Sequence, residues 1–145
     1  MSKQPRGGID HASASEHSRT FPSEFASVSL ARQFVRNSLG KPPAVPDDVV
    51  ADVELAVSEL ATNGVRHGSG DPVTVELSRD NRMVNMSVTS TLAIGATDNT
   101  SNWERAAPSG LSGRGIGVVR AVSTGLTYRI TGRAVVASCS FLIPM

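Results

Sequence analysis

The sequence predicts an α+β fold, a two-layer sandwich in which a mostly antiparallel sheet is covered on one face by about three helices. Helical and strand patterns do not alternate regularly along the chain, which argues against a doubly wound parallel sheet, the weaker alternative. The 145 residues are also the length of one domain with a single core, so a second domain is not expected.

The amino terminus is rich in Ser, Gly, Pro and charged residues and has no apolar core of the kind that a secretory signal needs. Residues 1–18 are therefore expected to form a disordered polar tail, and residues 19–145 the folded domain. His11 and His17 lie in this tail, where a metal-binding role is not expected. No apolar run approaches the roughly 20 residues of a membrane-spanning helix, so we expect a soluble cytoplasmic protein.

The overall composition argues against several classes of function. The formal net charge is only +1 and aromatic residues make up 4% of the chain, so direct binding of nucleic acid is not expected. Cys139 is the only cysteine, which excludes an internal disulfide and a cysteine-rich zinc site. Its apolar surroundings predict a small buried thiol rather than a reactive one.

An edge strand and two amphipathic helices are expected first. Residues 19–25 (RTFPSEF) predict a short edge strand, where a proline is tolerated because an edge need not donate every hydrogen bond. Residues 27–39 carry apolar side chains at helical spacing, and Gly40 with the prolines that follow ends this helix. The second helix begins at the acidic pair Asp47–Asp48 and ends at Gly68.

A hairpin is expected next. Residues 73–78 and 83–89 alternate apolar and polar side chains, and a turn at Asp80 and Asn81 joins them. This pattern predicts two antiparallel strands with one buried face.

Periodicity is lost between residues 90 and 113, where small, polar and Gly residues surround Trp103. A segment of this length inside a domain is usually functional or disordered, and a lid over a ligand is the functional version. Residues 113–123 begin with glycines and turn helical, and residues 126–143 predict a closing hairpin with its turn at Thr131–Gly132.

The stretch SELATNGVRHG ends the second helix with unusual polar residues. Glu59 and Asn63 are four residues apart and project from the same side, at the margin of the apolar stripe. A carboxylate there could activate a hydroxyl or a water, and an amide oxygen could complete the shell of a magnesium ion. The alternative is a solvated helix edge with a glycine cap.

The glycine string Gly113-Arg114-Gly115-Ile116-Gly117 is a second candidate site. Glycines let the backbone approach a phosphate closely, and the helix that follows offers free N–H groups. The string does not follow a clear strand as a Rossmann fingerprint should, and GxxxxGK[ST] does not occur in the chain. A flexible hinge of the preceding loop is the alternative.

These features occur in one order: an E-x-x-T-N-x-x-x-H-G helix, a hairpin, an irregular segment, then GxGxG opening a helix. That order resembles the GHKL ATPase superfamily of gyrase, chaperone and histidine-kinase ATP-binding domains, and within it the bacterial anti-sigma-factor serine kinases. The resemblance runs from about Arg19 to Pro144. It implies the Bergerat-type ATP-binding fold.

The resemblance also implies roles for single residues. Glu59 matches the general base, and Asn63 matches the magnesium ligand that joins the ion to the ATP phosphates. Thr62 and His67 match positions near the nucleotide, although His67 could equally be a satisfied helix-end residue. Arg114 would be either a nucleotide contact or a surface side chain. The positions that match the phosphate-cradling glycines are Gly113, Gly115 and Gly117.

The chain departs from the family at the end of the second hairpin strand. Related proteins usually place an aspartate there, where its carboxylate accepts a hydrogen bond from adenine, but this chain has Ser90. A hydroxyl can accept the bond with about 1 kcal/mol, against about 1.5–3 for a charged partner. Asp98 is a candidate substitute.

By resemblance, the expected function is that of an anti-sigma-factor-like protein serine/threonine kinase. It would bind ATP and Mg²⁺ and regulate transcription by switching between a sigma factor and an anti-sigma antagonist, as a free-standing domain that forms a homodimer. Ser90 motivates the alternative, a GHKL-fold regulatory protein-binding module with weak or no catalysis. An unrelated α+β fold with a chance motif is the third hypothesis.

Overall fold

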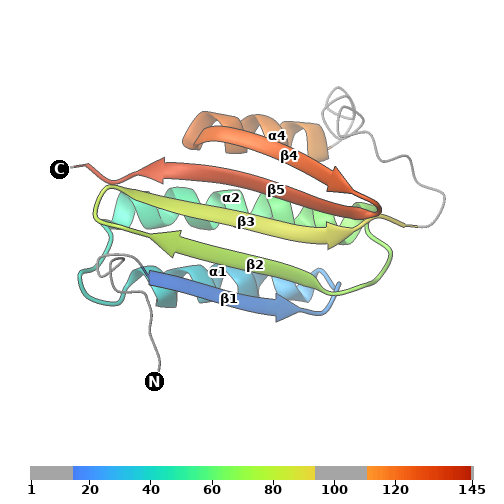
Figure 1. Cartoon of the computed structure of the whole chain (residues 1–145), viewed down its shortest axis with the longest axis horizontal. Helices are drawn as coiled ribbons and strands as arrows, with labels where there is room; N and C mark the ends of the chain where they lie inside the picture. The colour runs from blue at the N-terminus through green and yellow to red at the C-terminus, as the bar shows by residue number, and fades with distance from the viewer. Residues whose placement is uncertain (1–14, 94–110, 145) are drawn as a thin grey trace, which may run out of the picture.

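The computed structural model describes residues 15–93 and 111–144. Within them, strands and helices form two layers, with the helices behind the sheet in Figure 1. In chain order the elements are β1 (Ser15–Phe21), α1 (Ala26–Leu39), α2 (Asp47–His67), β2 (Val73–Arg79), β3 (Met83–Thr91), α4 (Leu111–Val122), β4 (Thr124–Thr131) and β5 (Ala134–Leu142).

The sheet has five strands in the order β1-β2-β3-β5-β4, and every pair of neighbours is antiparallel. Helices α1, α2 and α4 all cover the same face (Figure 1). The predicted α+β sandwich is therefore confirmed, and the parallel alternative is wrong. Both predicted hairpins, β2–β3 and β4–β5, are present.

The core lies between the helices and the covered face of the sheet. α2 buries Val53, Val57 and Leu60 completely, at 0–1% exposure, because their spacing keeps them on one side of the helix. β2 and β3 bury alternate residues, as a strand with one covered face requires. Among the described helices, none is both long enough and apolar enough to cross a membrane.

Helix α2 is also stabilised at its ends by charge. Asp47 and Asp48 lie in its first turn, and Arg66 and His67 in its last. The negative charges at the amino end and the positive charge of Arg66 at the carboxyl end interact favourably with the helix dipole, each by about 0.3–1 kcal/mol. The prediction that this helix spans Asp47 to Gly68 is confirmed within one residue.

Several boundaries differ from the prediction, since β1 ends at Phe21 rather than at residue 25 and α4 begins at Leu111 rather than at residue 113. β1 begins at Ser15, so four residues assigned to the polar tail belong to an edge strand. That strand is held by backbone hydrogen bonds to β2. Such bonds do not depend on the side chains, so the sequence shows no alternation of apolar residues there. β3 continues to Thr91, so Ser90 lies inside the strand rather than after it. Trp103 and Asp98 lie outside the described residues.

Cys139 is buried at 3% exposure in β5, as predicted. Burial raises the pKa of its thiol to about 12, because the charged thiolate would lose its hydration. A hydrogen bond with Ser123 acts in the opposite direction and is the smaller effect.

Candidate functional site

Asn63 is the polar residue that the structure buries most deeply in α2. Its side chain is 1% exposed, and among the described residues its Nδ2 has no hydrogen-bond partner. Leaving a buried amide unpaired costs about 1–3 kcal/mol, so such a group is unusual in a folded protein. A side-chain amide offers both N–H donors and a carbonyl oxygen. Asn63 is thus suited to a ligand that brings acceptor oxygens or a cation.

The next residue, Gly64, brings α2 into close contact with β3. A Cβ atom added at Gly64 would lie 3.1 Å from Cβ and 3.4 Å from Oγ of Ser90, and 3.6 Å from Cγ2 of Val73. A glycine in a helix interior costs about 0.5–1 kcal/mol relative to alanine, and here it permits this close approach. Ser90, which is 5% exposed, is therefore packed beside the helix turn that carries Asn63.

The end of α2 is joined to the end of β3. Gly68 forms an antiparallel bridge with Leu92, and the N–H of Ser69 donates to the carbonyl of Thr91 at 2.8 Å. A Cβ at Gly68 would lie only 2.3 Å from the carbonyl oxygen of Gly64, so a larger residue would displace the helix end. The backbone therefore fixes the distance between the polar end of α2 and Ser90.

His67, the last residue of α2, is half-buried, and its carbonyl accepts from the N–H of Ala93 at 3.4 Å. Burial lowers the pKa of the imidazole below its ordinary value, and the neighbouring Arg66 charge lowers it further. Both effects disfavour the imidazolium, so the folded protein favours a neutral His67.

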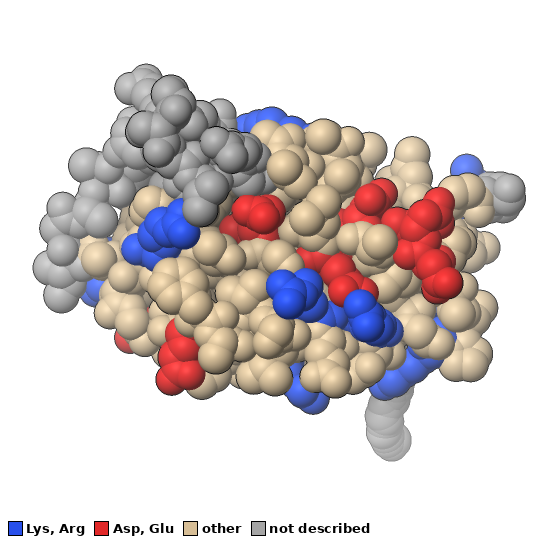
Figure 2. Space-filling view, turned by 180° about the vertical axis from the view of Figure 1, so that it is seen from behind, with Lys and Arg blue, Asp and Glu red and all other residues tan. Residues whose placement is uncertain are grey.

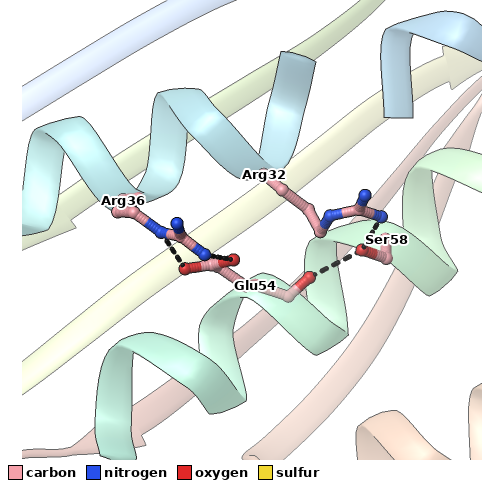
Figure 3. A network of polar contacts seen from close by, with 4 residues as sticks. All are labelled: Arg32, Arg36, Glu54 and Ser58. Atoms are coloured by element: carbon pink, nitrogen blue, oxygen red, sulfur yellow. Dashed lines mark hydrogen bonds and ion pairs between the residues drawn. The ribbon is translucent and has the colours of Figure 1, made fainter. Parts of the chain in front are cut away.

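Glu59 is half-buried and lines a groove of about 680 Å³ between α1 and α2. Figure 3 shows the polar contacts of four other residues that line this groove: Arg36 forms a bidentate ion pair with Glu54, at 2.9 and 2.8 Å, and Arg32 donates to Oγ of Ser58 at 3.2 Å. Asn63 does not line this groove. Glu59 thus borders the outer groove, whereas Asn63 is buried in the interior.

Thr62 points away from Asn63 by about 100° around the helix. Its hydroxyl donates to the carbonyl of Ser58 at 2.6 Å, so its hydrogen bond is made within α2. The predicted place of Thr62 near a nucleotide gains no support from this contact and stays a prediction.

Charges of both signs are interspersed over the helical face of the molecule (Figure 2). A second hollow, of about 630 Å³, lies on the opposite, open face of the sheet and is lined by Ser, Thr and Asn side chains together with Glu16, His17 and Glu76. None of the predicted site residues lines it.

The glycine string does not precede its helix as predicted. Gly113, Arg114 and Gly115 lie within α4, which begins at Leu111, and Gly117 is exposed in the same helix. Packing overrides the low helix propensity of the glycines, because α4 buries Ile116 and Val119 in the core. α4 packs against α2 on the same side of the sheet (Figure 1), which argues against a chance combination of the two motifs.

Sequence analysis did not single out Gly64 or Arg133. Gly64 had a signal, because an isolated glycine inside a helical pattern often marks a close approach to another element. Arg133 follows the β4–β5 turn, and both Nε and Nη2 donate to the carbonyl of Leu92, at 3.0 and 2.8 Å. These residues are 41 positions apart, so only the strand register reveals the contact.

Comparison with known families matches residues 21–139 to the family described as "Histidine kinase-like ATPase domain". Comparison with curated protein sequences gave no match. Among solved structures, the fold is similar to that of the RsbU and RsbW domains of Rv1364c from Mycobacterium tuberculosis, with a TM-score of 0.68 and 15% identity. The match covers 90% of this chain and 33% of that longer chain, so the present chain spans about a third of it.

Proposed function

This chain belongs to the histidine kinase-like ATPase domain family, and from that premise we propose that it binds ATP with Mg²⁺ as a protein serine/threonine kinase of the anti-sigma-factor type. The observation that carries the proposal is the buried amide of Asn63, whose Nδ2 has no hydrogen-bond partner among the described residues, next to Gly64, which packs against Ser90. A fold similar to one that contains an RsbW domain supports the choice of branch. The proposed role is control of transcription by partner switching between a sigma factor and its antagonist, in the cytoplasm and as a homodimer.

The residues at the inner side of α2 fit a magnesium–nucleotide complex. The carbonyl oxygen of Asn63 is a suitable ligand for Mg²⁺, which commonly takes only one or two protein ligands besides phosphate oxygens and waters. Its N–H groups suit phosphate oxygens as acceptors. Ser90 and His67 lie at the same end of α2, as the proposal requires of groups near the nucleotide.

Bound ATP and Mg²⁺ would supply the γ-phosphoryl group and the neutralisation of its charge. The chain itself would position these groups through Asn63 and the free backbone N–H groups in the first turn of α4, which includes Gly113 and Arg114. Glu59 is the proposed base: its carboxylate would accept the proton of the attacking serine or threonine hydroxyl. Because Glu59 opens towards the outer groove between α1 and α2, the hydroxyl of a partner protein could approach it from solvent.

The alternative function is a regulatory module of the same fold with weak or no catalysis. The different surroundings of Glu59, at the outer groove, and of Asn63, in the interior, favour it, because a base and a metal ligand must serve the same reacting group. Ser90 favours it too, since a hydroxyl would hold adenine less strongly than a carboxylate.

Calorimetric titration with ATP and MgCl₂ tests the proposal, followed by phosphoryl transfer to a partner-derived serine substrate. We expect binding at submillimolar ATP, and a loss of transfer of about 100-fold or more in Glu59→Gln with ATP binding retained. Binding without transfer by the wild-type chain would support the regulatory module. Absence of binding at millimolar ATP would remove the kinase function and leave the regulatory module.

A further inference from the structure

The short segment from Thr91 to Ala93, where the chain leaves β3, is held from two sides. Its polar backbone groups alternate in direction, as they do in any strand. The carbonyl of Thr91 and the N–H of Ala93 bond to the end of α2, through Ser69 at 2.8 Å and His67 at 3.4 Å. This side joins the strand end to the helix that carries Asn63.

On the other side, β5 pairs with β3 as far as Thr91, opposite Ala134, and Arg133 holds the segment at the next residue, Leu92. The N–H of Leu92 donates to the carbonyl of Arg133 at 2.7 Å, and the guanidinium of Arg133 donates twice to the carbonyl of Leu92. Arg133 thus binds both polar groups of Leu92. The turn that presents it contains Gly132 at φ +62°, a conformation that glycine adopts without strain.

These contacts bear on the candidate site because the clamped segment directly follows Ser90. Ser90 packs against α2 at Gly64, in the helix turn that carries Asn63, at a distance where an added methyl group would already be too close. A small shift of the strand end would therefore change the spacing between Ser90 and Asn63. Bidentate bonds from a guanidinium are both strong and directional, so Arg133 is well suited to prevent that shift.

We propose that Arg133 is a positioning residue of the nucleotide site, an inference that rests on the proposed function. Arg133 acts through Leu92, holding the end of β3 against the end of α2 so that Ser90 and Asn63 keep the spacing that purine and phosphate groups require. Arg133 itself would not contact the nucleotide. Its substitution therefore weakens nucleotide binding through geometry, and the wild-type discrimination between ATP and GTP changes with it.

The variants for the test are Arg133→Gln and Arg133→Lys, with Arg129→Gln as the matched control. Glutamine removes the charge and cannot form the bidentate contact with the carbonyl of Leu92. Lysine retains the charge and can donate one hydrogen bond to the same carbonyl. Arg129 is exposed on β4 of the same hairpin and loses the same charge, but it faces Val136 rather than the end of β3.

Two measurements are made at a temperature where every variant is folded. Titration with ATP and with GTP in MgCl₂ should give a Kd for ATP about tenfold higher in Arg133→Gln, an intermediate value in Arg133→Lys, and the wild-type value in Arg129→Gln. Amide hydrogen exchange of the free protein should accelerate at Ser69 and Ala93 in Arg133→Gln, with that of Met86 in mid-strand unchanged.

Failure of this inference differs from failure of the proposed function. If the wild-type chain binds ATP, and Arg133→Gln binds both nucleotides with the same Kd, the positioning role is overturned, even where the unfolding temperature falls. Unchanged amide exchange at Ser69 overturns it as well, because the contacts of Arg133 with Leu92 would then have no effect on the end of α2. If the wild-type chain itself binds no ATP, the proposed function fails first, and the role of Arg133 fails with it.

Discussion

The contact between Gly64 and Ser90 makes a quantitative prediction about stability. In Gly64→Ala, the new methyl group would lie 3.1 Å from Cβ of Ser90, inside normal contact distance. Alanine gains about 1 kcal/mol over glycine from helix propensity, and overpacking a core contact costs about 1–3 kcal/mol. β3 lies between β2 and β5 and cannot move freely, so we expect a net loss of about 1 kcal/mol.

The background variant Ser90→Gly removes both atoms that the methyl group would meet at 3.1 and 3.4 Å, leaving Cγ2 of Val73 in ordinary contact at 3.6 Å. In that background, Gly64→Ala should stabilise the protein by about 1 kcal/mol, which gives a coupling of about 2 kcal/mol. Urea unfolding of the four proteins, followed by circular dichroism, measures the cycle. If Gly64→Ala has the same effect in both backgrounds, within about 0.3 kcal/mol, the described approach of α2 to β3 is refuted.

Three further outcomes are expected. Gly117→Ala should stabilise the protein by about 0.5–1 kcal/mol in thermal unfolding, because a Cβ there meets no described atom within 4 Å, and a lower stability would contradict its exposed place in α4. The pKa of His67 is lowered from its ordinary 6.5 by burial and then by Arg66, so the unfolded chain binds the proton more readily. The stability that results is complete above pH 6.5 and is lost as the pH falls below it. In His67→Gln, the free energy of unfolding should therefore depend less on pH in this range. A pH dependence parallel to that of the wild type would refute the lowered pKa. Finally, the thiol of Cys139, with its pKa of about 12, should react with Ellman's reagent at pH 8 only as fast as the protein unfolds, and prompt labelling of the native protein would show that it is accessible.

Most of the fold could be predicted because it depends on periodicity. The apolar stripe of α2, its acidic start and its glycine end all lie within the helix itself, and the structure reproduces them. The alternation in β2 and β3 likewise reports which face is covered. By contrast, the first four residues of β1 are held by backbone bonds to a neighbour, and such bonds leave no mark on side-chain pattern.

The candidate site could be predicted only in part. Glu59 and Asn63 were found because a polar pair four residues apart is unusual at the margin of an apolar stripe. Their different surroundings, an outer groove for Glu59 and the interior for Asn63, depend on where α1 and α4 pack against α2. The contact of Arg133 with Leu92 depends on the register of β3 and β5, which follows from the whole sheet.

ATP and Mg²⁺ are proposed to bind at the inner side of α2, at Asn63. Nuclear magnetic resonance of the ¹⁵N-labelled chain, titrated with ATP in MgCl₂, tests this claim most directly. We expect the side-chain amide signal of Asn63 to shift together with the backbone signals of Gly64 and Ser90, while Ser138 on the open face of the sheet does not respond. Saturable shifts centred on Ser138, or no shift of Asn63 at millimolar ATP, would contradict it.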